Sequence, residues 1–410
     1  MDDSRRWVRL GIAGKAALIS AGAFTSVGLF SMGSALPRLA SDFGHAPNAA
    51  LLVQLVGSVV APIFALASPL AAALVNRFGV RRIYIASIVL TAVGGAGPAL
   101  CDNLAAILAL RVLLAAGVAG AFTAGMSGTA LLPDAQRPTV IGLISFFGGG
   151  ICIPLFPLVG ILAEESWRSA FLVHLIALPV ILLALGLPGP STDIAADAAR
   201  SADTDRRAAG LLAGIPATSA VVAAVVGLSM VASSMYSPFF LASIGIAEPA
   251  RIGQILGAMS LCSLIGSGSY GFVHRRVGTQ GLLKVGLASI AAGCLVMSMS
   301  TGISAVLCGI GLLGAGLSIF VASIYASAIE SVSAESSAPA AMGVITFCLY
   351  GSQMLFPLIS GPVGQWAGPA AVFLLLAILV LLGLVLTMTM KRSRPVQKTA
   401  SPEPNCEATS

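Results

Sequence analysis

Charge is scarce in this chain: only 9% of its 410 residues are charged, whereas a soluble domain carries roughly 25%. Hydrophobic residues make up 57% of the sequence, and the mean hydropathy is +0.97. These values exclude a soluble globular domain and indicate a chain that lies in a lipid bilayer. A phosphate-binding loop is also missing, because Gly14-Lys15-Ala16 lacks both the glycine spacing and the hydroxyl residue after lysine. ATP therefore cannot drive the protein directly, and we expect neither a cofactor nor an enzymatic reaction.

A disulfide framework or a metal site is not indicated either. The chain has seven cysteines, an odd number. Most of them fall inside apolar stretches, namely Cys152, Cys262, Cys294, Cys308 and Cys348. Small apolar filler residues are therefore the favoured interpretation of these cysteines.

Apolar stretches of about 20 residues recur along the whole chain, and each can cross a hydrocarbon core of about 30 Å. They must be helices, because open sheet edges cannot be satisfied in lipid and the alternating pattern of barrel strands is absent. The sequence therefore predicts an all-α membrane protein with twelve transmembrane helices. The predicted spans are 16–36, 50–72, 83–101, 104–127, 139–162, 169–187, 213–236, 251–272, 282–299, 304–327, 340–361 and 369–390.

Acidic residues are absent from these predicted spans, since all 16 fall outside them. Proton-coupled carriers usually keep a carboxylate in the cavity, where burial and substrate can change its protonation. If proton coupling occurs here, the coupling group must be a loop-proximal acid such as Asp42 or Asp102, His174, or the solute itself. His174 is the one imidazole predicted within a span, and packing is the favoured role for it.

The two halves of the chain resemble each other. Four pairs of sites recur at an offset of 199 or 200: Leu155-Phe156-Pro157-Leu158 with Leu355-Phe356-Pro357-Leu358, Gln54-Leu55-Val56-Gly57 with Gln254-Ile255-Leu256-Gly257, Trp167 with Trp366, and Gly79 with Gly278. Such repeats predict two pseudo-symmetric six-helix bundles, an arrangement in which secondary transporters place one binding site between rocking bundles. We expect bundles at 1–187 and 211–390, a polar cytoplasmic linker at 188–210 and a disordered cytoplasmic tail at 391–410.

Basic residues are distributed unevenly between the two sides of the membrane. With the N-terminus inside, 18 of the 22 lysines and arginines fall in cytoplasmic segments. This bias predicts that both termini are cytoplasmic. The net charge of +6 is then a signal of topology, and we expect no nucleic-acid partner.

Short motifs add a resemblance to a known family. The turn Ala72–Arg82 is similar to the signature loop of the major facilitator superfamily, Gly-x-Leu-x-Asp-Arg-x-Gly, and Gly271–Gly278 is its counterpart in the second half. Further partial matches to family motifs are Arg111 with Gly117 and Gly120, Gly150 with Pro157 and Gly160, and Trp167–Phe171. The order and spacing of these motifs cover nearly the whole chain, and the similarity is closest to drug/proton antiporter-type members with twelve helices.

The resemblance implies a set of gating residues in the two basic turns: Asn76, Arg77, Gly79, Arg81, Arg82, Arg275, Arg276 and Gly278. The chain also departs from the family pattern. Ala72 replaces the first glycine of the loop, and Asn76 replaces its aspartate. In the family that aspartate accepts hydrogen bonds from neighbouring helix ends and helps to lock the cytoplasmic side of the outward-open state. Asn76 can still form hydrogen bonds, but their charge-assisted part is lost. Phe156 stands where the antiporter motif has a glycine, which weakens the indication of export.

Several polar residues inside the spans are candidates for binding a solute. Arg111 is either a hydrogen-bonding anchor in the cavity or a clamp on carbonyls of the first helix. The other candidates are Tyr350 and Gln353, which share a helix face at a spacing of three, the symmetric pair Gln54 and Gln254, and Tyr236. Such residues are also common links between membrane helices.

An uncharged, partly aromatic lining suits an amphipathic or heterocyclic solute better than an ion. The expected function is alternating-access transport of such a solute, by efflux, in the inner membrane of a bacterium. Uptake of a neutral nutrient or vitamin such as riboflavin is the alternative within transport, and a transporter-like sensor or membrane enzyme is the alternative outside it. The expected partners are the small-molecule solute, with or without a coupled proton, and the lipid bilayer around a monomer.

Overall fold

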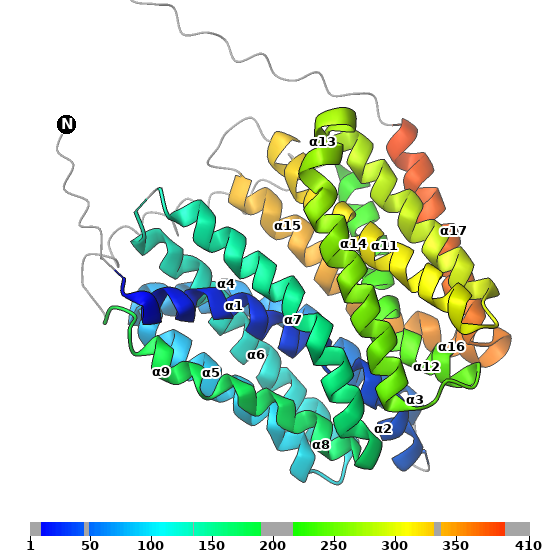
Figure 1. Cartoon of the computed structure of the whole chain (residues 1–410), viewed down its shortest axis with the longest axis horizontal. Coiled ribbons are helices and arrows are strands. Elements are labelled where there is room, and N and C mark those ends of the chain that lie inside the picture. Colours follow the sequence, from blue (N-terminus) through cyan, green and yellow to red (C-terminus); the bar gives the residue numbers. More distant parts are fainter. Residues whose placement is uncertain (1–9, 45–48, 134, 190–215, 332–337, 390–410) are drawn as a thin grey trace, which may run out of the picture.

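The computed structural model describes residues 10–44, 49–133, 135–189, 216–331 and 338–389 (Figure 1). Most of the predicted linker 188–210 and the whole predicted tail 391–410 lie outside these residues. Within the described residues every regular element is helical, as predicted. This follows from the need to satisfy each backbone polar group inside its own segment when lipid surrounds it.

The first bundle is built from six spans, several of them interrupted by short turns. Its elements are α1 (Ile12–Phe30), η1 (Gly33–Ala35), α2 (Leu36–Asp42), α3 (Ala49–Ser58), α4 (Val60–Phe78), α5 (Val80–Ala96), η2 (Gly97–Leu100), α6 (Leu104–Gly128), η3 (Thr129–Leu131), α7 (Arg137–Glu165), α8 (Trp167–Phe171), η4 (Leu172–Ala177) and α9 (Val180–Ala184).

The second bundle follows the same plan. Its elements are α11 (Ala217–Val231), η6 (Ala232–Tyr236), α12 (Ser237–Ser243), α13 (Pro249–Met299), α14 (Ile303–Ser331), α15 (Ala338–Gly351), η8 (Ser352–Leu355), α16 (Phe356–Ala367) and α17 (Pro369–Thr389).

The element α13 comprises two membrane spans. It runs for 51 residues, but Gly278 within it has φ 69° and ψ 177°, which no helix contains. The chain reverses there, and the two arms lie side by side in Figure 1. Eleven segments of the described chain are long and apolar enough to cross a membrane, α13 among them. Its two arms therefore bring the number to the twelve spans that the sequence predicts.

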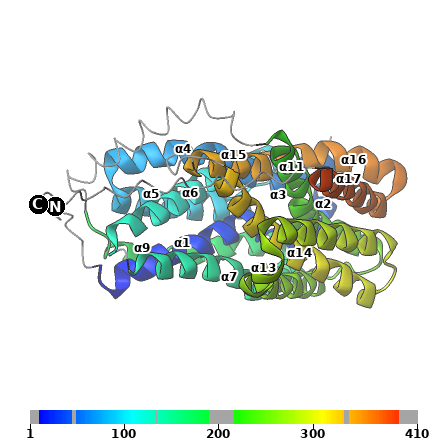
Figure 2. The same cartoon turned by 90° about the horizontal axis from the view of Figure 1, so that it is seen from above.

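The helices form two bundles, α1 to α9 and α11 to α17, which lie side by side in Figure 1. In Figure 2, α2 and α3 of the first bundle lie beside α11 and α16 of the second. We call the end that carries the turns around Gly79 and Gly278 the basic end, and the end that carries Asp42, Asp102 and Trp167 the far end. In Figure 1 the bundles meet at the far end and diverge toward the basic end.

Two helix irregularities lie just before prolines. Residues Ala232–Tyr236 form a π-helical turn, in which Ser237 N–H donates to the carbonyl of Ala232. Pro238 follows, and its ring cannot approach the carbonyl four residues earlier. Similarly, the 3₁₀ segment Ser352–Leu355 precedes Pro357. The sequence predicts both spans as continuous helices, and the structure differs because the prolines interrupt them. The helix boundaries are also wider than predicted, with α7 spanning Arg137–Glu165.

Large apolar side chains cover much of the outer surface. Trp366 is 92% exposed and Leu182 is 71% exposed, and α17 presents a row of exposed residues at helical spacing that includes Leu374, Ile378 and Leu382. Lipid tails can cover these surfaces without cost. The chain is therefore a multi-pass membrane protein.

Candidate functional site

The two bundles are in close contact at the far end, along α7 and α13. A Cβ atom on Gly160 would lie 2.3 Å from the carbonyl oxygen of Pro249, and one on Gly253 would lie 2.3 Å from that of Phe156. Only glycine lets two helix backbones approach so closely. These glycines therefore form a tight joint between the halves.

A second contact joins the second span to the eleventh. Ser360 Oγ, in α16, donates to Oε1 of Gln54, in α3, at 2.7 Å. The first and seventh spans also meet at this end, where a Cβ on Gly33 would lie 2.2 Å from the carbonyl oxygen of Ser234. The far end is thus closed by three pairs of helices, each with one member from each half.

The same helices part toward the basic end. The close glycine contacts between α7 and α13 extend as far as Gly257, which faces the carbonyl oxygen of Ile153. Further along, a Cβ on Gly149, Gly150 or Gly268 would meet nothing within 4 Å. Together with the divergence of the bundles in Figure 1, this geometry describes a carrier closed at the far end and open toward the basic end.

An aromatic cluster bridges the halves between these two regions. The ring centroids of Phe64, in α4, and Tyr350, in α15, lie 5.7 Å apart in an edge-to-face arrangement. Phe122, in α6, lies 5.8 Å from Phe64. Phe64 is buried, while Phe122 and Tyr350 are half-buried. We call Phe64, Phe122 and Tyr350 the aromatic cluster; the half-buried rings of Phe122 and Tyr350 can pack against a planar group.

Tyr350 has a polar neighbour on the tenth span. The hydroxyl of Tyr325, in α14, lies 2.9 Å from Oγ1 of Thr346, in α15. Both residues are half-buried. The aromatic cluster therefore borders on hydroxyl groups, which gives this part of the interface both apolar and hydrogen-bonding character.

The remaining predicted solute contacts are dispersed. Gln353 is 3% exposed and donates to the carbonyl of Leu349 in its own segment, at 3.4 Å. Tyr236 packs in the second bundle against Phe356, with ring centroids 5.5 Å apart, and against Phe373, at 6.0 Å. Among the described residues, neither Gln353 nor Tyr236 has a hydrogen bond or a ring contact with the aromatic cluster.

The symmetric glutamines have different surroundings. Gln54 is half-buried and bonded to Ser360, whereas Gln254 is exposed. Their equal positions in the repeat therefore do not give them equal environments.

Arg111 lies inside the first bundle. Its side chain is 0% exposed, and Nε donates to the carbonyl of Val56 at 3.1 Å. Val56 belongs to α3, in the second span, so the predicted clamp on carbonyls of the first helix was wrong about the helix. The reason is that α3 and α6 are neighbours near the far end, where the second and fourth spans begin.

His174 is a packed and hydrogen-bonded core residue. It is 0% exposed, and a Cβ on Gly95 would lie 2.3 Å from its ring. Nδ1 lies 2.9 Å from the carbonyl oxygen of Phe171, which can only accept, so Nδ1 carries a proton. Nε2 lies 3.3 Å from Oγ of Ser31, in the first span. His174 thus links the sixth span to the first.

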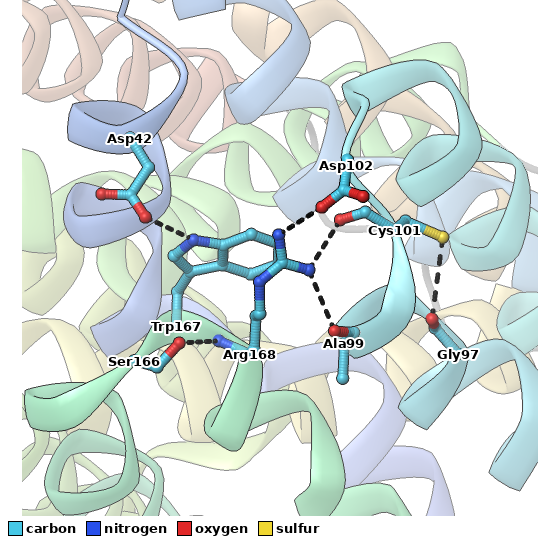
Figure 3. A network of polar contacts seen from close by, with 8 residues as sticks. All are labelled: Asp42, Gly97, Ala99, Cys101, Asp102, Ser166, Trp167 and Arg168. Atoms are coloured by element: carbon cyan, nitrogen blue, oxygen red, sulfur yellow. Dashed lines mark hydrogen bonds and ion pairs between the residues drawn. The ribbon is translucent and has the colours of Figure 1, made fainter.

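The two acids considered for proton coupling are engaged in a network at the far end (Figure 3). Trp167 Nε1 donates to Oδ2 of Asp42 at 2.7 Å, and Arg168 pairs with Asp102 at 2.7 Å. Arg168 also donates to two backbone carbonyls, those of Ala99 and Cys101, and its guanidinium lies over the Trp167 ring. The network ties together the ends of the first, third and sixth spans.

The predicted gating residues occupy two similar turns at the basic end. Gly79 has φ 84° and Gly278 has φ 69°, conformations that favour glycine. Arg77, Arg82, Arg275 and Arg276 are exposed, and Arg81 and Asn76 are half-buried. Within the described residues Asn76 has no side-chain hydrogen bond.

Sequence reasoning missed three residues that contribute to the interface. Phe64 and Phe122 are aromatic residues among many apolar ones, and no spacing distinguishes them. Ser360 lies two residues after the repeated segment Leu355–Leu358, but nothing in the surrounding sequence predicts a bond to Gln54. A contact across 306 positions leaves no local signal.

The comparisons with known proteins agree with this architecture. The family model described as Major Facilitator Superfamily matches residues 18–335. The fold is similar to that of the solved nucleoside transporter NupG, with a TM-score of 0.69 at 14% identity over 94% of this chain and 100% of that one. A mutant of NupG gives a TM-score of 0.72 at 14% identity, over 92% and 99%. No curated protein sequence matches the chain.

The family model covers well over half of the chain, and the fold agrees with it independently. The twelve spans, the two bundles and the glycine turns at the basic end are all features of one architecture. The chain belongs to the major facilitator superfamily and is a transporter of that family.

Proposed function

We propose that this transporter carries a small, uncharged, amphipathic solute with an aromatic or heterocyclic ring, by alternating access, and that it works in export. The aromatic cluster is the observation on which the proposal depends. It lies where the two halves part, and it takes rings from both halves. A planar solute that stacks there would contact both bundles at once, so its binding could influence their relative position.

The chemistry of the interface supports an uncharged solute. The residues around the aromatic cluster contribute hydroxyls and ring faces, including Tyr325 and Thr346. No acidic residue lies there among the described residues. A strongly charged solute would lose hydration without gaining an opposite charge.

Uptake of a neutral heterocyclic nutrient is the second candidate. Its specific support is the similarity of fold to a nucleoside transporter, NupG. A nucleoside also combines a planar ring with hydroxyls, which matches the groups at the aromatic cluster. Export and uptake differ only in the direction of net flux, so the same assay separates them.

The alternating step would open the far end. We propose that the bond between Ser360 and Gln54 breaks and that the joint around Gly160 and Gly253 separates, while the basic turns come together. The gating roles of Asn76, Arg77, Gly79, Arg81, Arg82, Arg275, Arg276 and Gly278 belong to this step. Gln54 acts as a latch here, and Tyr350 is the proposed solute contact, with Gln353, Tyr236 and Gln254 as secondary candidates.

We place the basic end in the cytoplasm of a bacterial inner membrane, because the concentration of arginines there follows the positive-inside rule. Single cysteines at Arg77 or Arg275, in a variant without the native cysteines, should be shielded from impermeant thiol reagents in intact cells. Cysteines at Glu165 or Gly364 should be labelled. The reverse pattern would refute this orientation.

A flux assay in proteoliposomes tests the solute class. We expect saturable transport of at least one uncharged ring-bearing compound from a panel of nucleosides, riboflavin and amphipathic dyes, and none for inorganic phosphate. Phe64→Ala and Tyr350→Ala should raise the half-saturation concentration about 2- to 12-fold, because loss of one aromatic contact costs about 0.5–1.5 kcal/mol. Phe347→Ala is the matched control, since Phe347 is on the same helix as Tyr350 but is 53% exposed.

Equal effects of the three substitutions would remove the aromatic cluster from solute binding. Transport in everted and right-side-out vesicles, with and without an imposed pH gradient, then gives the direction and tells whether a proton is coupled. Accumulation of solute against its gradient only in right-side-out vesicles would refute export and show uptake.

A further inference from the structure

A chain of hydrogen bonds with only one possible direction joins the tenth span to the eleventh. The hydroxyl of Thr346, in α15, lies 2.7 Å from the carbonyl oxygen of Met342. A carbonyl can only accept, so the single proton of the Thr346 hydroxyl is donated there. The hydroxyl of Tyr325, in α14, lies 2.9 Å from Oγ1 of Thr346. Tyr325 must therefore be the donor in this second bond.

The direction of the chain decides what Tyr325 can offer to a solute. Its proton is committed to Thr346, and the described residues provide no other hydrogen bond to its hydroxyl. The phenolic oxygen keeps a free lone pair but has no free proton, so it can act only as an acceptor. Because Thr346 in turn donates to Met342, the chain polarises the Tyr325 oxygen and strengthens it as an acceptor.

The hydroxyl pair Tyr325 and Thr346 lies beside the aromatic cluster, on the side of the basic end. The chain enters α15 at that end, so Thr346 is one turn closer to it than Tyr350 and shares a helix face with it. Gly343, a further three residues toward the basic end, is exposed, and a Cβ atom there would meet nothing within 4 Å. Both members of the hydroxyl pair are half-buried. This face of α15 is therefore open to a solute next to the hydroxyl pair.

Tyr350 does not impose the same restriction on a solute. Its hydroxyl has no hydrogen bond among the described residues, so its proton can rotate and the group can either donate or accept. Tyr325 lies within electrostatic range of Tyr350. A ring that packs against Tyr350 thus has the acceptor oxygen of Tyr325 as a neighbour.

We infer that Tyr325 makes the transporter selective for planar heterocycles with an N–H group on the ring edge, such as cyclic imides and amino-substituted rings. The inference rests on the proposed function, because it concerns a solute held at the aromatic cluster. An N–H donor pairs with the Tyr325 oxygen, whereas an edge of carbonyls or alkylated nitrogens leaves that oxygen without a donor. A site built to hydrogen-bond one group rejects the analogue that lacks this group more strongly than an apolar pocket does.

Matched pairs of solutes test this role in the proteoliposome flux assay. Each N–H compound of the panel that is carried, uridine and riboflavin among the candidates, is compared with its N-methylated analogue, which keeps the ring but lacks the donor. We expect the methylated form to have a half-saturation concentration about 2- to 12-fold higher. In Tyr325→Phe this ratio should fall to about 1, because the acceptor is lost. Tyr270→Phe is the matched control and should keep the parent ratio, since it removes the same atom from a half-buried tyrosine of α13 whose ring stacks on His274.

Thr346→Val separates hydrogen bonding from steric exclusion of the methyl group. Valine keeps the shape of threonine but cannot accept the Tyr325 proton, so the Tyr325 hydroxyl becomes free to donate to a carbonyl of the solute. We expect the methylated solutes to improve and the ratio to fall, although the Tyr325 side chain itself is unchanged. A ratio set by steric exclusion would stay at the parent value in this variant.

Equal half-saturation concentrations for the two members of each pair would overturn the inference and leave the proposed function intact. The same holds for a ratio that persists in both Tyr325→Phe and Thr346→Val, and for transport restricted to rings without an N–H group. Failure to transport any ring-bearing compound would instead refute the proposed function itself. If Tyr325→Phe does not fold, the ratio in the parent protein and its change in Thr346→Val decide.

Discussion

The two halves of this transporter share a backbone plan but have different interiors. Arg111 is buried in the first bundle, and the residue 200 positions later is Gly311. The first bundle also buries His174 and links it to Ser31 across two spans. In the second bundle the corresponding support is aromatic, with Phe240 and Phe373 5.3 Å apart. The repeat therefore preserves the helix arrangement, while each half has its own side-chain chemistry.

Repeated residues show the same difference. Trp167 is 2% exposed, whereas Trp366, its counterpart, is 92% exposed. Gln54 is bonded to the other half, and Gln254 is exposed. Symmetry at the level of sequence thus predicts position in the fold but not burial, because the partner residues, Asp42 of Trp167 and Ser360 of Gln54, are not themselves repeated.

The tryptophan pair should give the largest contrast. Trp167→Ala should destabilise the protein by about 3–5 kcal/mol, because a large buried ring is lost together with its bond to Asp42. Trp366→Ala should change stability by less than about 0.5 kcal/mol. Thermal unfolding of both variants in detergent measures the difference, and similar losses would show that the far ends of the halves are equivalent after all.

The glycine turns should instead behave alike. Gly79→Ala and Gly278→Ala each force a side chain into a backbone conformation with positive φ, which costs about 1–3 kcal/mol. We expect comparable shifts of the unfolding midpoint in the two variants. If only one of the two variants lowered the unfolding midpoint, the halves would differ in their backbone requirements as well as in their side chains.

The glutamine pair tests the link between the halves. Gln54→Ala should destabilise the closed state of the far end by about 0.5–1.5 kcal/mol, because the bond to Ser360 is lost. An impermeant reagent should therefore label a cysteine at Gly364 faster. Gln254→Ala should leave the labelling rate within experimental error of the parent, since its side chain is exposed. Faster labelling in both variants would argue against the bond to Ser360 as a latch.

The smallest effect should come from the exposed ion pair at the far end. Asp102 is 89% exposed and Arg168 is 38% exposed, so Asp102→Asn should cost only about 0.2–1 kcal/mol and should lose even this in high salt. Because Asp102 has a structural partner, any proton dependence that the parent protein shows should be unchanged in this variant. A lost proton dependence would assign Asp102 to coupling.

The sequence was sufficient to predict the twelve spans and the two bundles, because length and hydropathy determine what can cross a bilayer. It was also sufficient to locate the turns around Gly79 and Gly278. It could not predict that Arg111 bonds to Val56 of the second span, or that Phe64 meets Tyr350. These contacts depend on how helices far apart in the chain pack, and apolar spans of similar composition give no pattern that selects one neighbour over another.

The π-helical turn Ala232–Tyr236 contains one residue more than an α-helical turn would hold at this point of the seventh span. An α-helix turns by about 100° and rises about 1.5 Å for each residue. If the π-helical turn became α-helical, the segment Ser237–Ser243 would rotate about the helix axis by about that angle. The α-helices on both sides would keep their own hydrogen bonds. Tyr236 sits at this swivel, against Phe356 of the eleventh span. A small change of winding there could reorient a large ring without any helix having to break.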